Sequence, residues 1–237
     1  MNVQIAKERR QMNNNNPVSD AFSHPLLDEY LAAKPPGGPL RIGLVGGPNG
    51  GKSTVMGYVA RQFPGLVSQL DETATLFLTS GLTAVPSQEE LIDRWLSRFQ
   101  PAMLLTQIMR ELEAYDEAVL KGGIRAIVSD RGTADAMVYM PGLHDELAAR
   151  FSGLTTRILY AAYDKVVHLE SLATAKPELF SAQGNDKRYE NLEKAQRVEM
   201  LTREAWQGHP DYHFIPGANG IEYVVGQVDG ILRPILT

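Results

Sequence analysis

The sequence predicts an α/β protein in which a parallel sheet is covered by helices on both faces. Short apolar runs alternate with longer segments of helical periodicity along most of the chain, the pattern expected of such a sheet. The chain has 237 residues, of which 43% are hydrophobic, and this size suits one domain with a short appendage. A glycine-rich loop directly after the first apolar run supports the same fold class, because such loops connect a strand to a helix.

Each element has its own signal. The five apolar runs expected to form strands are residues 40–45, 66–70, 124–129, 165–169 and 212–215. Helices are expected over residues 51–63, in a charged segment that ends near Trp206, and over residues 221–232. A capping-box pattern at residues 87–90 predicts the start of a further helix, which Pro101 kinks or restarts before it reaches Gly122.

The first residues differ from the rest of the chain. An asparagine run at residues 13–16 precedes a short apolar patch, and a Pro- and Gly-rich stretch at residues 34–39 follows it. We therefore expect a flexible N-terminal arm and linker over residues 1–38 and one catalytic domain over residues 39–237.

Composition excludes several classes of function. With no cysteine, the chain has no disulfide scaffold, thiolate metal site or catalytic thiol. A net charge of −5 removes the electrostatic case for broad nucleic-acid binding but leaves room for a local basic pocket. No stretch approaches the ~18 apolar residues of a membrane span, and the first residues lack the apolar core of a secretory signal. We expect a cytoplasmic protein without a membrane span.

The glycine-rich loop matches the pattern G-x-x-x-x-G-K-[ST] between a predicted strand and a predicted helix. Its glycines allow backbone amides to point at a phosphate chain at the start of a helix. Lys52 is expected at the β- and γ-phosphates, and the Ser53 hydroxyl at a bridging Mg²⁺. The residues predicted to bind nucleoside triphosphate, ATP or GTP, are Gly46, Gly47, Pro48, Asn49, Gly50, Gly51, Lys52, Ser53 and Thr54.

Acidic residues follow two of the predicted strands, where the carboxyl ends of a parallel sheet meet the phosphate loop. Asp130 is the candidate for a magnesium contact through water, and the adjacent Arg131 for a phosphate contact. Glu72 is the candidate to accept the proton of an attacking hydroxyl, with Asp71 as its competitor.

Other residues have weaker signals. A polar loop around Arg188 has the composition of a lid that closes over the triphosphate, although an exposed helix start explains it equally well. His168 is expected to be an ordinary strand residue. The row Trp95, Phe99, Met103 and Met109 is interpreted as core rather than as a binding surface.

Taken together, these motifs resemble a known family. They are the phosphate loop, Glu-Thr-Ala-Thr at 72–75, Phe99-Gln100, Gln107 with Glu111, Asp130-Arg131-Gly132-Thr133-x-Asp135 with Tyr139, Tyr163-Asp164-x-Val166-x-His168-Leu169, and Arg188-x-Glu190. The set resembles the AAA-type P-loop domains that include the ribosylnicotinamide kinase domain of NadR-type proteins and a eukaryotic GTP- and lipid-binding protein. It is more distantly similar to thymidylate and deoxynucleoside kinases.

The resemblance covers about residues 40–235 and implies a three-layer α/β/α P-loop fold with strand order 2-3-1-4-5. It implies a catalytic set of Lys52, Glu72, Asp130, Arg131 and Arg188, with Gln107 and Asp135 also at the acceptor. Residues 216–220 lack the asparagine expected directly after the last strand, which departs from the family pattern.

The activity expected from this resemblance is transfer of the γ-phosphoryl group of ATP to a nucleoside- or nucleotide-like acceptor. Two alternatives stay open: a kinase for a modified base hydroxyl in DNA, and a non-catalytic GTP- or ATP-binding regulatory module. The sequence also leaves a homodimer open.

Overall fold

The computed structural model describes residues 29–30, 37–139, 159–160, 162–180 and 191–237. Its centre is a five-stranded sheet in the order β2-β3-β1-β4-β5, and every neighbouring pair is parallel. The strands are β1 (Leu40–Val45), β2 (Val67–Leu70), β3 (Ala126–Asp130), β4 (Lys165–Leu169) and β5 (Tyr212–Ile215). The predicted fold class and strand order are confirmed.

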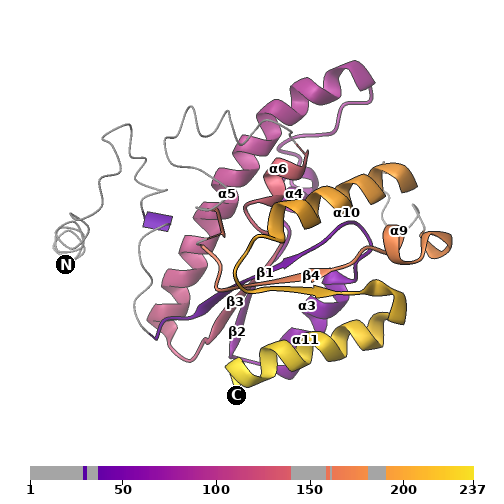
Figure 1. The fold of residues 1–237 in the computed structure, drawn as a ribbon. Coiled ribbons are helices and arrows are strands. Elements are labelled where there is room, and N and C mark those ends of the chain that lie inside the picture. Colours follow the sequence, from indigo (N-terminus) through magenta and orange to yellow (C-terminus); the bar gives the residue numbers. More distant parts are fainter. Residues whose placement is uncertain (1–28, 31–36, 140–158, 161, 181–190) are drawn as a thin grey trace.

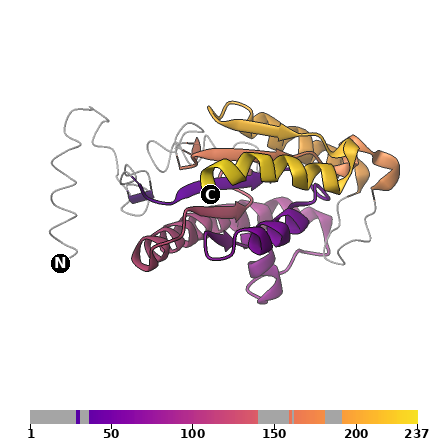
Figure 2. The same cartoon turned by 90° about the horizontal axis from the view of Figure 1, so that it is seen from below.

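Helices form a layer on each face of this sheet (Figure 1). One face is covered by α3 (Lys52–Gln62) and α11 (Ile221–Leu236), and the opposite face by α5 (Ile92–Lys121), α6 (Asp135–Tyr139) and α10 (Leu192–Trp206). Figure 2, turned by 90°, shows α11 and α3 together in front of the strands. Shorter segments are α4 (Thr73–Thr79), α9 (Leu172–Ala175) and single 3-10 turns at Glu89–Leu91, Pro177–Leu179 and Gly217–Asn219.

The side chains of each central strand divide between two apolar clusters, because successive residues of a strand point to opposite faces. Ile42 and Leu44 of β1 pack with α3 and α11. Val45 packs on the other side with Ile108 of α5 and Trp206 of α10. Both faces of the sheet are therefore buried, and its carboxyl edge is left to carry the polar loops.

Helix α5 differs from the prediction at its start and at its middle. The capping box does not form: the hydroxyl of Ser87 contacts the side chain of Gln88, and no side chain caps the 3-10 turn that precedes α5. Pro101 lies inside one continuous helix of 30 residues and does not restart it. Packing along the length of α5 outweighs the single main-chain hydrogen bond that proline removes.

The N-terminal segment contributes one described side chain to the core. Tyr30 is 2% exposed, its hydroxyl donates to Glu111 Oε2 at 2.5 Å, and the guanidinium of Arg41 lies 5.1 Å from its ring centroid. The boundary of the arm near residue 38 remains a prediction, but Tyr30 itself packs against the domain. No helix within the described ranges combines the length and the apolar character needed to cross a bilayer.

Candidate active site

The phosphate loop joins β1 to α3 at the carboxyl edge of the sheet. Gly46 has φ 132° and Gly51 has φ 83°, and Asn49 is also left-handed at φ 58°. A Cβ atom on Gly46 would lie 2.1 Å from the carbonyl oxygen of Leu169, so the loop can approach β4 only with glycine at this position. The result is a tight turn at a helix N-terminus, a geometry that suits an anion.

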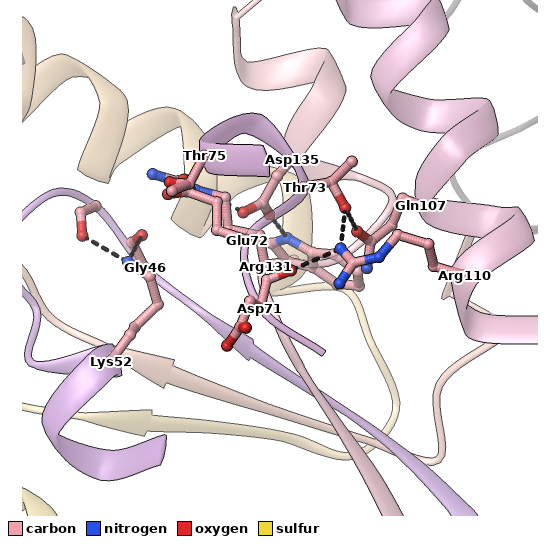
Figure 3. Close-up of polar contacts among 12 residues, drawn as sticks. Gly46, Lys52, Asp71, Glu72, Thr73, Thr75, Gln107, Arg110, Arg131 and Asp135 are labelled. Carbon is pink, nitrogen blue, oxygen red and sulfur yellow. Dashed lines mark hydrogen bonds and ion pairs between the residues drawn. The ribbon is translucent and has the colours of Figure 1, made fainter. Parts of the chain in front are cut away.

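Lys52 opens α3 with its side chain folded back over this loop (Figure 3). Its Nζ donates to the carbonyl oxygens of Gly46 at 2.9 Å and Gly47 at 3.0 Å. Burial and the neighbouring Arg131 lower the pKa of Lys52 from its ordinary value, and the nearby carboxylates oppose that change. The Lys52 ammonium therefore donates to two neutral carbonyl oxygens, and phosphate oxygens can replace them as hydrogen-bond acceptors.

A salt-bridged cluster follows β2 and β3. Arg131 donates through Nε to Glu72 Oε1 and lies 3.5 Å from Asp135 Oδ2 through a terminal nitrogen. Thr75 Oγ1 donates to the second oxygen of Glu72 at 2.7 Å. Arg131 has φ 72°, an unusual conformation for a non-glycine residue, which turns it from the end of β3 toward Glu72.

The cluster fixes the ionisation of Glu72. Burial raises its pKa, but Arg131, the Thr75 hydroxyl and Lys52 outweigh that effect and lower the pKa to about 2. Burial also lowers the pKa of Arg131, yet Tyr139, Glu72 and Asp135 raise it well above the ordinary arginine value. At neutral pH Glu72 is therefore a negatively charged carboxylate, and Arg131 is a positively charged guanidinium.

The structure distinguishes Glu72 from Asp71, which sequence reasoning could not do. The side chain of Asp71 is exposed, whereas Glu72 contacts Arg131 directly. The backbone carbonyl of Asp71 accepts from Arg110 at 2.7 Å. Asp71 thus helps to place the loop after β2, and Glu72 turns toward the phosphate loop.

Asp130 ends β3 opposite Leu44 of β1. Its Oδ1 atom is buried and has no hydrogen-bond partner among the described residues. Burial raises the pKa of Asp130, although Lys52 and Arg131 act in the opposite direction. An unsatisfied carboxylate oxygen here, together with the exposed hydroxyl of Ser53 on α3, fits the oxygen ligands that Mg²⁺ takes directly or through water.

A cavity of about 360 Å³ opens beside the cluster, between α4, α5 and the loop after β3. Trp95 and Phe99 stack in its wall with ring centroids 4.4 Å apart. Met103 and Gln107 continue the same row at intervals of four residues. The interpretation of this row as core is wrong for Met109, which is 43% exposed. Phe99 is buried, but it lines the cavity together with Trp95 and Met103, so core packing is not their whole role. Their alignment with Gln107 was the signal that could have shown it.

Two glutamines line the cavity, and they differ in what they can still bind. Gln107 accepts from Thr73 Oγ1 and donates to Glu111 Oε1 at 2.7 Å, so both ends of its amide are engaged. Gln100 is 3% exposed, and its Oε1 has no partner in the described part of the chain. Gln100, which the site prediction did not include, therefore offers the free acceptor. Of the other predicted site residues, Asp135 lies in the cluster, and Arg188 lies outside the described residues.

Comparisons with known proteins bear on the family and the fold of this chain. A family model described as an AAA domain (AAA_28) matches residues 41–220. A search of curated protein sequences gives no match. Among solved structures, a deoxyadenosine kinase from M. mycoides with bound dATP matches with a TM-score of 0.55 and 11% identity, covering 82% of this chain and 99% of that chain.

At 11% identity the structural likeness concerns the fold alone, which this chain shares with that deoxyadenosine kinase. The family model, in contrast, spans well over half of the chain, from β1 to the residue before α11. The chain therefore belongs to this AAA domain family of P-loop proteins.

Proposed function

We propose that this protein is an ATP-dependent P-loop kinase that transfers the γ-phosphoryl group to a nucleoside- or nucleotide-like acceptor. One observation carries the proposal: the ion pair of Glu72 and Arg131 lies between Lys52 on the phosphate loop and the side chain of Gln107 in the cavity wall (Figure 3). The phosphate loop, as the proposed site of the phosphoryl donor, and the cavity, as the proposed site of the acceptor, therefore adjoin the same ion pair.

The cavity has the chemistry of a site for a flat, partly polar molecule. Its wall combines the stacked rings of Trp95 and Phe99 with apolar side chains, and its volume of about 360 Å³ is in the range of small-molecule sites. The unpartnered Oε1 of Gln100 favours a bound molecule that carries an N–H or O–H donor, because an unpaired buried acceptor costs free energy. A heterocyclic base with an amino or imino group meets both requirements.

In the proposed reaction an acceptor oxygen attacks the γ-phosphorus, the bond from that phosphorus to the bridging oxygen breaks, and ADP leaves. Lys52 exchanges its carbonyl partners for phosphate oxygens, and Arg131 faces the transferring group. With a pKa of about 2, Glu72 is a weak base, so its main contribution is to orient the acceptor hydroxyl and take its proton late in the transfer.

Magnesium fits the same edge of the sheet. Ser53 and Asp130 would hold it, Ser53 through its hydroxyl and Asp130 through its unpartnered Oδ1. When bound, the ion would neutralise the negative charge that develops on the phosphates during transfer.

The test incubates the full-length protein with labelled ATP, Mg²⁺ and a panel of nucleosides, nucleotides and single-stranded DNA. We expect transfer to one class of nucleoside-like acceptor by the wild type and loss of transfer in Lys52→Ala and Glu72→Ala. Transfer to DNA alone would favour the base-modification alternative. Tight nucleotide binding without transfer to any acceptor would favour the regulatory module.

A further inference from the structure

One peptide group of the phosphate loop, between Gly46 and Gly47, is held at both ends. Its carbonyl oxygen accepts from Lys52 Nζ at 2.9 Å. Its N–H, on Gly47, donates to Glu199 Oε2 at 2.7 Å. Glu199 comes from the middle of α10, 152 residues away in the sequence. A distant carboxylate thus fixes the orientation of the peptide on which the phosphate-loop lysine rests.

Glu199 is itself held on both oxygens. Its side chain is buried, and its Oε2 accepts a second hydrogen bond from the Ser171 N–H at 3.2 Å. Its Oε1 lies 2.7 Å from Nε2 of His168, a residue that is fully buried in β4. The other ring nitrogen of His168 lies 2.8 Å from the hydroxyl of Tyr212 in β5. The chain Tyr212–His168–Glu199 therefore runs across the sheet and ends on the phosphate loop.

The loop and the carboxylate also fit together sterically. A Cβ atom on Gly47 would lie 2.8 Å from Glu199 Oε2 and 3.1 Å from Ser171 Cβ, so a side chain at this position would displace the Glu199 carboxylate. The next residue, Pro48, accepts through its carbonyl oxygen from the Ser171 hydroxyl. The loop is thus attached to Ser171, the N-cap residue of α9, and to Glu199 of α10. The amides at the start of α3 have no such attachment to Glu199 and stay available for a ligand.

From this geometry we infer that Glu199 is a positioning residue for the nucleotide, which holds the phosphate loop in its binding conformation before ATP arrives. The inference rests on the proposed function, because it assumes that the loop binds a triphosphate. Without the carboxylate, the Gly46–Gly47 peptide can rotate, and the free energy needed to order it is lost from nucleotide binding. His168 and Tyr212 act through Glu199 by fixing its rotamer.

The experiment compares Glu199→Ala with Glu199→Gln and with Glu204→Ala, a control that removes an exposed glutamate from the same helix. MgATP affinity is measured by calorimetry, and KM for ATP, KM for the acceptor and kcat are measured separately. Glu199→Ala should raise the MgATP Kd at least about tenfold, with the acceptor KM unchanged, since only the phosphate loop is released. Glu199→Gln should stay within about threefold of wild type, because its amide oxygen still accepts from Gly47 and its nitrogen can donate to the other tautomer of His168. Glu204→Ala should equal wild type.

The inference is overturned if folded Glu199→Ala binds MgATP as tightly as wild type, or if Glu199→Gln loses as much affinity as Glu199→Ala. It is also overturned if KM for ATP and KM for the acceptor rise together, which is the sign of a general loss of structure. Should Glu199→Ala fail to fold, His168→Gln replaces it, with an expected three- to tenfold rise in Kd and the same criterion for failure. If the wild-type protein binds no nucleotide, the proposed function is overturned as well. That result needs no variant, so it is distinguishable from failure of the inference about Glu199.

Discussion

Tyr30 and Gln107 are joined through one buried carboxylate, because they donate to the two oxygens of Glu111. Tyr163 donates to Glu111 as well, at 2.7 Å, and its own hydroxyl accepts from the N–H of Thr133. A tyrosine that precedes the first strand thus supports Gln107 in the wall of the cavity. Glu111 is 1% exposed, so this network has no solvent to replace a lost donor.

Tyr30→Phe removes one donor to this carboxylate and leaves the ring in place. We expect the free energy of unfolding to fall by about 1.5–3 kcal/mol, the range for a hydrogen bond to a charged group. Urea unfolding followed by circular dichroism measures the change. The matched control is Tyr58→Phe, which removes a contact to Asp229 at the surface of α3 and α11 and should change stability by well under 1 kcal/mol. Equal effects of the two variants would contradict a core role for Tyr30.

Glu72→Gln retains the size of the side chain and removes its charge beside Arg131. We expect kcat to fall about 10²- to 10⁴-fold, the usual contribution of a positioned proton acceptor, with the KM for ATP within a few-fold of wild type. Asp71→Asn, one residue earlier and exposed, is the control and should retain most activity. A loss in Asp71→Asn that exceeds the loss in Glu72→Gln would reverse the assignment of the two acids.

The pH profile of the wild type gives a second test of the same carboxylate. Because Arg131, Thr75 and Lys52 outweigh burial and lower the pKa of Glu72 to about 2, this group stays ionised throughout the range in which the protein is folded. The rate should therefore show no inflection from Glu72 between about pH 4 and 9. Any acidic limb that shifts when Glu72 is replaced by Gln would show that its pKa is much higher than the ion pair allows.

Asp130→Asn should make the nucleotide-free protein more stable and its activity more dependent on Mg²⁺ concentration. A carboxyl group whose pKa is raised on folding destabilises the folded protein above that pKa, so a neutral amide should raise the Tm of the nucleotide-free protein, by about 2–4 °C for each kcal/mol gained. The same change should increase the Mg²⁺ concentration needed for half-maximal activity, because an amide is a poorer ligand for the ion. Thermal melts and a magnesium titration measure the two effects. A lower Tm together with an unchanged magnesium requirement would argue against the placement of the ion at Asp130.

Trp95 provides a direct signal for the acceptor. Trp95 lines the cavity, whereas the second tryptophan of the chain, Trp206, is fully buried at the end of α10, where its indole N–H donates to Asp135 of α6. Acceptor binding should therefore quench the fluorescence of Trp95, and Trp95→Phe should abolish the change while the emission of Trp206 remains. Trp95→Ala should raise the acceptor KM by roughly fivefold and leave the KM for ATP unaltered, since stacking contributes on the order of 1 kcal/mol. An undiminished fluorescence change in Trp95→Phe would place the acceptor elsewhere.

The sheet was predictable because its signals are local. Each strand is a short apolar run, and the phosphate loop fixes the point at which the first strand becomes a helix. The bounds of β4 and β5 agree with the sequence prediction at both ends. The start of α5 was not predicted, because a 3-10 turn with Gln88 rather than Ser87 at its cap position precedes the helix, and the Ser87 hydroxyl contacts the Gln88 side chain instead of a backbone amide.

Site residues at the ends of strands could be predicted from the sequence. Site residues on helices that are distant in the sequence could not. Glu72 and Arg131 occupy strand ends, so their proximity follows from a parallel sheet. Glu199 has no motif of its own and reaches the loop only through the packing of α10. The engagement of Gln107 by Thr73 and Glu111, which leaves Gln100 as the free acceptor, depends on side-chain orientations that no spacing reveals.

Pro101 separates the first turns of α5 from the rest of the helix. Without an amide hydrogen, it leaves the carbonyl of Ser97 without its usual partner within the helix. The turns before it carry Trp95 and Phe99, while those after it are fastened through Glu111 to the centre of the domain. We expect α5 to bend at Pro101 and so to accommodate larger and smaller acceptors. The range of substrates would then depend on the first turns of α5, while the residues at the carboxyl edge of the sheet keep their arrangement.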